Sequence, residues 1–166
     1  MTAPIPATIT ATVVAGLERS AAAVGAAFAA DPAALARPYA AGKWTGRQML
    51  LHIVDCESAF LDRVKRTLAD AKPLLWALDP DRWNARLVFP NRSLLVSKQL
   101  FDAQRALLNE FVSSLAADEW QRCAVHNEAG KLSLHDLLAK FVSHTEHHLE
   151  QVEATIAGRT WTAQSG

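Results

Sequence analysis

Apolar side chains recur at helical spacing in four long stretches of the chain, which cover residues 10–30, 45–70, 93–117 and 133–157. In each stretch they fall every three or four positions and so share one face of an α-helix. The pair Asp31-Pro32 is expected to stop the first helix. No stretch alternates strongly enough to predict a strand that competes with the helices. The pattern therefore predicts an all-α protein, most simply a four-helix bundle.

Capping residues support the boundaries of the second and fourth helices. Thr45 and Gln48 form the T-x-x-Q pattern of a capping box, and Ser133 stands three residues before Asp136 in the same relation. Gly158 follows the last apolar residue of the fourth helix and is expected to end it.

The connection between the second and third helices is unusually long. Residues 71–91 contain three prolines together with Trp76 and Trp83. A tight turn needs far fewer residues, and a linker of this size could run back along a helix of about 24 residues, which is about 36 Å long. We therefore predict a long crossover and an up-down-down-up order, with the second and third helices parallel. We expect the two tryptophans to lock the crossover; the alternative is that they line a substrate pocket.

Composition limits the class of protein. The chain has 166 residues, of which 50% are hydrophobic and 20% charged, which predicts one compact domain over residues 1–166. Lys plus Arg equal Asp plus Glu at 17 each, so no basic excess favours nucleic acid as a partner. No signal peptide or membrane span is recognisable. Two cysteines are typical of a reducing compartment, and we expect a cytoplasmic protein.

Histidines supply the candidate chemistry. His144 and His148 are four residues apart, which stacks two imidazoles on one helix face at the spacing of two metal ligands. His147 is expected to point furthest toward water, which disfavours the pair of His144 with His147. His52 lies in the first two turns of the second helix, and it reaches the height of His148 only if the second and fourth helices are antiparallel. The up-down-down-up order provides that arrangement.

Three neutral imidazoles could bind a divalent ion and leave a position for water or substrate. Such an ion lowers the pKa of a bound water or thiol toward neutrality, so hydrolysis and thiol transfer are both open. The amide of Gln151 could orient a ligand or a bound water. Asp55 could accept a hydrogen bond behind a ligand or carry a proton; the alternative is a solvated helix residue.

Other polar residues near these positions have plainer interpretations. We expect Cys56 to be a buried, inert thiol, although it could approach the ion as a soft fourth ligand and close the site. Glu57 lies near the apolar face and is expected to find an arginine or backbone partner. His126 and His135 are predicted to lie at the surface, away from the other histidines.

These motifs together resemble the DinB/YfiT-like family of bacterial metal-binding four-helix bundles. The resemblance rests on two long motifs and two short ones, which are GKWTGRQMLLHIVD at 42–55, HTEHHLEQ at 144–151, FPNR at 89–92 and GKLS at 130–133. It covers nearly the whole chain.

The resemblance implies an up-down-down-up bundle in which His52, His144 and His148 bind zinc or nickel, and it implies a homodimer. It further implies a metal-dependent enzyme, either a transferase that uses a low-molecular-weight thiol as cosubstrate for a small-molecule electrophile or a hydrolase-like relative in which the ion activates water. The alternative is a non-catalytic metal-binding or dimeric interaction protein. A Ser-His-Asp hydrolase is disfavoured because the chain has no G-x-S-x-G motif.

Overall fold

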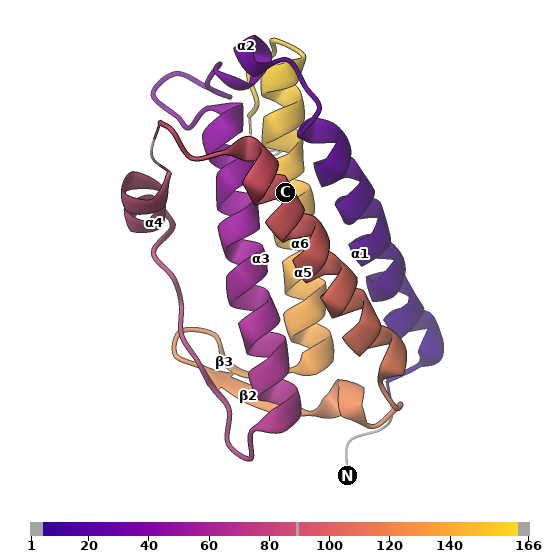
Figure 1. Ribbon diagram of the computed structural model, residues 1–166. Coiled ribbons are helices and arrows are strands. Elements are labelled where there is room, and N and C mark those ends of the chain that lie inside the picture. Colours follow the sequence, from indigo (N-terminus) through magenta and orange to yellow (C-terminus); the bar gives the residue numbers. More distant parts are fainter. Residues whose placement is uncertain (1–4, 89, 163–166) are drawn as a thin grey trace.

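The computed structural model of the chain describes residues 5–88 and 90–162. Its body is a bundle of four long helices, each within a few residues of a predicted stretch (Figure 1). They are α1 (Ala7–Ala27), α3 (Gly46–Ala69), α5 (Leu94–Ser114) and α6 (Leu134–Ile156). Both predicted capping boxes are present, at Thr45 with Gln48 and at Ser133 with Asp136.

The order of the helices is up-down-down-up, as predicted (Figure 1). Helices α3 and α6 are antiparallel: Phe60 stacks on Phe141 at 4.3 Å between ring centroids, whereas Gly46, at the start of α3, lies beside Thr155, near the end of α6. Helices α3 and α5 are parallel, and the crossover between them returns to the level at which α3 began. This arrangement brings the start of α3 to the second half of α6.

Two short helices depart from the prediction. Helix α1 ends at Ala27, before Asp31-Pro32, as expected, and Asp31 then caps α2 (Pro32–Leu35) through a hydrogen bond from the Ala33 backbone. Within the crossover, Asp79 caps α4 (Pro80–Leu87) through a hydrogen bond from the Arg82 backbone. Proline suits the first helical position because its missing N–H would have no helical partner there. In both cases an Asp-Pro pair begins a helix.

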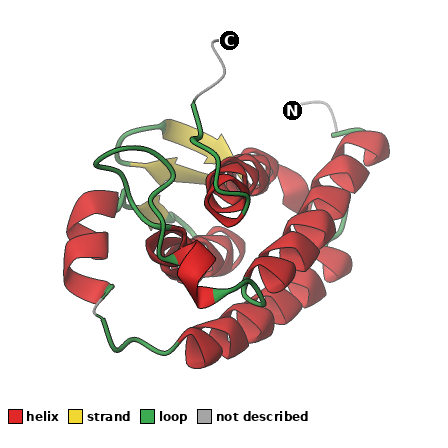
Figure 2. Cartoon of the chain, turned by 90° about the horizontal axis from the view of Figure 1, so that it is seen from above, coloured by secondary structure: helices red, strands yellow, loops and turns green. Residues whose placement is uncertain are grey.

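Three short strands accompany the helices, although the sequence carried no strand signal strong enough to predict them. Strands β1 (Leu74–Leu75), β2 (Cys123–His126) and β3 (Gly130–Ser133) make a small sheet in the order β1-β2-β3. The β1–β2 pair is parallel and the β2–β3 pair is antiparallel. Figure 2 shows the sheet beside the bundle. Strands of two to four residues are too short for alternation to be visible in the sequence, so long-range pairing decides them.

A buried ion pair joins three helices in the core. Arg105 donates to both carboxylate oxygens of Glu57, with distances of 3.0 Å and 2.6 Å, and its Nη1 donates to the Leu17 carbonyl and to the Ser20 hydroxyl. Burial raises the pKa of Glu57, and Arg105 counteracts that rise. The expected arginine partner of Glu57 is confirmed. Removing one member of such a pair typically costs about 3–5 kcal/mol, because the other is left buried and unpaired.

The crossover is not locked by its tryptophans. Trp76 is 71% exposed and Trp83 is half-buried. Polar contacts hold the crossover instead: Asn84, on α4, is buried and accepts a hydrogen bond from Gln48, while Arg92 pairs with Asp55 through two hydrogen bonds of 2.8 Å and 2.7 Å.

None of the described helices combines the length and apolar character that crossing a membrane would require.

Candidate metal centre

Three histidines from two helices meet in the upper half of the bundle. His52 on α3 lies 5.5 Å from His144 and 4.8 Å from His148, measured between ring centroids, and the two rings on α6 are 4.4 Å apart. The Nε2 atoms of His144 and His148 are 3.2 Å apart. The cluster exists because antiparallel packing brings the second turn of α3 to the fourth turn of α6.

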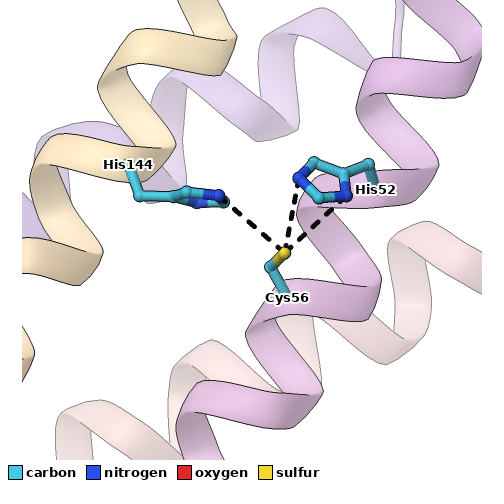
Figure 3. Close-up of side chains that lie close together, drawn as sticks. All are labelled: His52, Cys56 and His144. Carbon is cyan, nitrogen blue, oxygen red and sulfur yellow. Dashed lines mark hydrogen bonds between the residues drawn. The ribbon is translucent and has the colours of Figure 1, made fainter. Parts of the chain in front are cut away.

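Cys56 joins this cluster from one turn farther along α3. Its Sγ atom lies 3.5 Å from Nε2 of His52 and 3.9 Å from Nε2 of His144 (Figure 3). Ligand atoms of His52, Cys56 and His144 all lie within 4.8 Å of one another. The sequence predicted a buried, inert thiol; the structure confirms that Cys56 is buried and places it against the imidazoles. Its i, i+4 spacing from His52 was the available signal.

Burial keeps the four side chains uncharged in the absence of an ion. It lowers the pKa of His52 to about 4 and that of His144 to about 3, and His148 reinforces both changes by like-charge repulsion. The pKa of His148 is lowered by burial as well. Burial raises the pKa of the Cys56 thiol to about 12. The imidazoles are therefore neutral at pH 7, the state in which they can donate a lone pair to an ion.

Gln151 orients one of the imidazoles. Nδ1 of His148 lies 2.8 Å from Oε1 of Gln151, and because an amide oxygen can only accept, Nδ1 must carry the proton. The lone pair of His148 is then on Nε2, the atom that faces His144. Trp44 packs against His52 with the ring centroids 5.1 Å apart and limits its rotation. The hydrogen bond to His148 is thus the means by which Gln151 can orient a ligand.

The donor set fits a divalent first-row ion. Metal–nitrogen bonds of about 2.0–2.1 Å in a tetrahedral site place two nitrogen ligands about 3.3 Å apart, close to the observed 3.2 Å between the Nε2 atoms of His144 and His148. Without an ion, two neutral imidazoles come this close as an N–H···N hydrogen bond, in which Nε2 of His144 donates to the lone pair on Nε2 of His148. Nδ1 of His144 is buried without a hydrogen-bond partner in the described part of the chain, which is consistent with a ring positioned by its other nitrogen.

The cluster forms the wall of a cavity of about 590 Å³. His126 was predicted to lie away from the other histidines, but it lines this cavity because the β2–β3 hairpin folds back toward the bundle. Backbone N–H groups of Glu128 and Ala129 donate to its Nδ1, each at 3.2 Å. His147 is exposed, as predicted, and packs against Trp161 where it borders the cavity.

Two further candidates lie elsewhere. Asp55 does not border the cavity; its carboxylate is turned toward Arg92 at the end of the crossover. His135 is half-buried beside Trp120 at the start of α6. The sequence could not assign the partner of Asp55, because Arg92 is 37 residues away.

The family model of the DinB superfamily matches residues 16–152, which include all four clustered side chains. The chain belongs to the DinB superfamily.

Relatives of the chain carry names that refer to metal-dependent hydrolysis. A protein of Oceanobacillus iheyensis named "putative metal-dependent hydrolase" is 27% identical over 130 residues, which cover 76% of this chain and 72% of that protein. The protein YfiT of Bacillus subtilis, with the same description, is 25% identical over 75% of this chain and 71% of its own length.

Solved structures show the same fold. That of YfiT from Bacillus subtilis, described as a probable metal-dependent hydrolase with an unusual four-helix bundle topology, aligns with a TM-score of 0.84 at 20% identity and covers 98% of this chain and 94% of that one. TT2238, described as a four-helix bundle protein, aligns with a TM-score of 0.62 at 26% identity, over 87% of this chain and 98% of that one.

Proposed function

We propose that this DinB-superfamily protein is a divalent-metal-dependent enzyme whose ion is held by His52, His144 and His148. The observation that carries the proposal is the convergence of three neutral imidazoles on the wall of a cavity of about 590 Å³. A site with three protein ligands and access for small molecules is typical of catalytic centres, whereas structural sites are closed. Zinc and nickel are the ions that we expect.

A bound ion would supply Lewis acidity that lowers the pKa of a water or of a low-molecular-weight thiol toward neutrality. The chain's own residues do the rest: Gln151 keeps the lone pair of His148 on Nε2, and Trp44 restrains His52. The cavity is large enough for a small electrophile together with a nucleophile. The names of the relatives support water as the nucleophile, and we propose the thiol as the second candidate, which would make the protein a thiol S-transferase.

The metal content of the purified protein tests the ligand set. Wild-type protein, dialysed against a weak chelator, should retain close to one zinc or nickel ion per chain by elemental mass spectrometry, and His52→Ala and His148→Ala should lose it. His135→Ala is the matched control, because this histidine lies on α6 but outside the cluster, and it should retain the ion. A wild-type protein that stays empty after remetallation would overturn the proposal.

The activity itself requires a comparison of two nucleophiles. The metal-loaded protein is incubated with activated esters in water, and with small electrophiles together with a panel of low-molecular-weight thiols. Products that form with the wild type and are lost in His148→Ala identify the reaction. Hydrolysis without added thiol supports the hydrolase, whereas strictly thiol-dependent product supports the transferase.

A non-catalytic metal site is the second candidate function, and the position of Cys56 favours it. A thiolate from Cys56 would occupy the fourth position and close the coordination sphere. Cobalt substitution separates the two cases, since thiolate ligation gives a strong near-ultraviolet charge-transfer band. If the band is present in the wild type and absent in Cys56→Ser, the site is closed. If the two spectra match and lack the band, the fourth position is open.

Homodimerisation and a cytoplasmic location are further proposals. The two cysteines are both free, one of them exposed, which suits a reducing compartment. Sedimentation velocity at several protein concentrations measures the oligomeric state directly.

A further inference from the structure

A buried arginine lies on the same wall as the proposed metal ligands. Arg63 is on α3, eleven residues after His52, and at about 100° per residue it returns to within about 20° of the same helix face. Its residue is 8% exposed, and it borders the cavity together with the histidines. Side chains on a helix lean toward its N-terminus, so the guanidinium extends toward Cys56.

The guanidinium has no carboxylate partner. Its Nη2 donates to the carbonyl of Trp76, and its plane lies over Phe60 with Cζ 4.9 Å from the ring centroid. Among the described residues no ion pair includes Arg63, in contrast with Arg105, which pairs with Glu57. Burial of a charge without a paired opposite charge is costly, and burial lowers the pKa of Arg63 by more than Cys56 and Asp62 raise it. One hydrogen bond leaves most of its donors available.

The positive charge of Arg63 affects titratable groups that line the cavity. It contributes to lowering the pKa of His126 and of His144, which border the cavity from the hairpin and from α6. Lys43 adds a second cation at the margin, and Asp81 is the single carboxylate among the described lining residues. An ion on neutral histidines would add two more positive charges. Arg63 and Lys43 together outnumber Asp81, so the cavity carries a net positive charge.

We propose that the cavity binds an organic anion whose carboxylate is held by Arg63 and whose opposite end lies at the histidine cluster. The role of the ligand's end at the histidines rests on the proposed function, whereas the binding of its carboxylate by Arg63 does not. Guanidinium pairs with carboxylate through two parallel hydrogen bonds, which orient as well as attract the ligand.

Phe60 sets the size of this ligand. Its ring centroid is 4.9 Å from the guanidinium carbon and 5.9 Å from the ring centroid of His144. The guanidinium carbon and the His144 ring are therefore at most about 11 Å apart, which suits an acid built on one substituted aromatic ring. Phe60 and Leu78 supply apolar contacts along that path.

Binding of benzoate, with benzamide as its uncharged analogue, tests the proposal without knowledge of the natural substrate. Both probes are titrated into the metal-free and the metal-loaded full-length protein and followed by NMR chemical shifts. We expect benzoate to bind both forms, and benzamide to bind at least about tenfold more weakly, since a charge-assisted hydrogen bond is worth more than a neutral one.

Two variants of Arg63 and one matched control assign the effect. Arg63→Met should weaken benzoate at least about tenfold, and Arg63→Lys should weaken it less because the charge remains. Arg66→Met is the control: Arg66 is one turn away, half-exposed and bonded to Asp62, so its loss should leave the affinity of benzoate unchanged. Equal binding of benzoate and benzamide, or full affinity in Arg63→Met, would overturn the proposal.

A wild-type measurement covers the case in which Arg63→Met fails to fold. Arg63 also borders a second cavity of about 670 Å³ beneath the crossover, with Trp76 and Trp83. Intermolecular NOEs from the benzoate ring to His144 and Phe60 support the proposal, and NOEs to Trp83 in their place overturn it. An empty metal site in the elemental analysis would refute the proposed function, yet it would leave benzoate binding to metal-free protein unaffected, so the two failures are distinguishable.

Discussion

Oε1 of Gln151 accepts a hydrogen bond of 2.8 Å from Nδ1 of His148. The two residues are three positions apart on α6, so the bond is made within one helix turn. It leaves the Nε2 lone pair of His148 facing Nε2 of His144, and it ties Gln151 to the proposed metal site without any direct contact between the amide and an ion.

Gln151→Leu should weaken metal binding by about 10–100-fold, the effect typical of losing a hydrogen-bond partner behind a histidine ligand. Gln151→Glu keeps an oxygen at this position and should restore the affinity. Competition with a chromophoric chelator at pH 7 measures the dissociation constant. Unchanged affinity in Gln151→Leu would show that the hydrogen bond does not position His148.

Asp55→Asn should lower stability and leave the metal site intact, because the structure pairs Asp55 with Arg92 rather than with a histidine. Hydrogen bonds between charged partners contribute about 1.5–3 kcal/mol, and urea unfolding should register a loss of that order. Elemental analysis of the same sample should find the wild-type amount of metal. Arg92→Gln should reproduce both results. Normal stability with lost turnover would instead identify Asp55 as a catalytic residue.

Gly46→Ala should destabilise the bundle by about 1–3 kcal/mol, as is usual for overpacking. A Cβ at residue 46 would overlap Oγ1 of Thr155 and lie 3.2 Å from the Leu35 side chain. Adding Thr155→Ala should recover part of the loss, and the double-mutant cycle gives the coupling. Gly25 is the control, because a Cβ there meets nothing within 4 Å; Gly25→Ala should stabilise α1 by about 0.5–1 kcal/mol. If the effects of Gly46→Ala and Thr155→Ala on stability were strictly additive, the added Cβ would not contact Thr155, and the prediction would be wrong.

Asp136→Asn should reduce stability by about 0.5–1 kcal/mol at pH 7, and the difference should shrink in acid. Its hydrogen bonds with Ser133 hold the pKa of Asp136 below the ordinary value of 3.8. A carboxylate with a depressed pKa in the folded state stabilises the protein above the ordinary value, and this contribution is lost as pH falls through the folded value. Urea unfolding of both proteins from pH 7 downward measures the difference, and a constant difference would contradict the prediction.

The local features of the chain could be predicted from the sequence. Helical periodicity, the capping boxes and the i, i+4 spacing of His144 and His148 depend on residues within one or two turns of one another. The length of the crossover predicted the parallel pair α3 and α5, and that topology in turn brought His52 to the level of His148. The prediction of the triad therefore depended on one inference about the order of the helices.

Short elements escaped prediction for a different reason. A strand of two to four residues has no periodicity to detect, and β1, β2 and β3 are stabilised by partners up to about fifty residues away. The helices α2 and α4 did have a local signal, since Asp-Pro is an N-cap followed by a favourable first residue. That signal was interpreted at Asp31-Pro32 as the end of a helix.

The sequence by itself determined the four long helices and two histidine positions that can share an ion, because both depend on helix periodicity. Tertiary structure alone decided which side chains surround them. Cys56 approaches the imidazoles, His126 enters the cavity from a hairpin, Asp55 turns to Arg92, and Arg63 is buried without a carboxylate. Each outcome depends on which elements pack together, and desolvation and pairing of polar groups are set only once that packing exists.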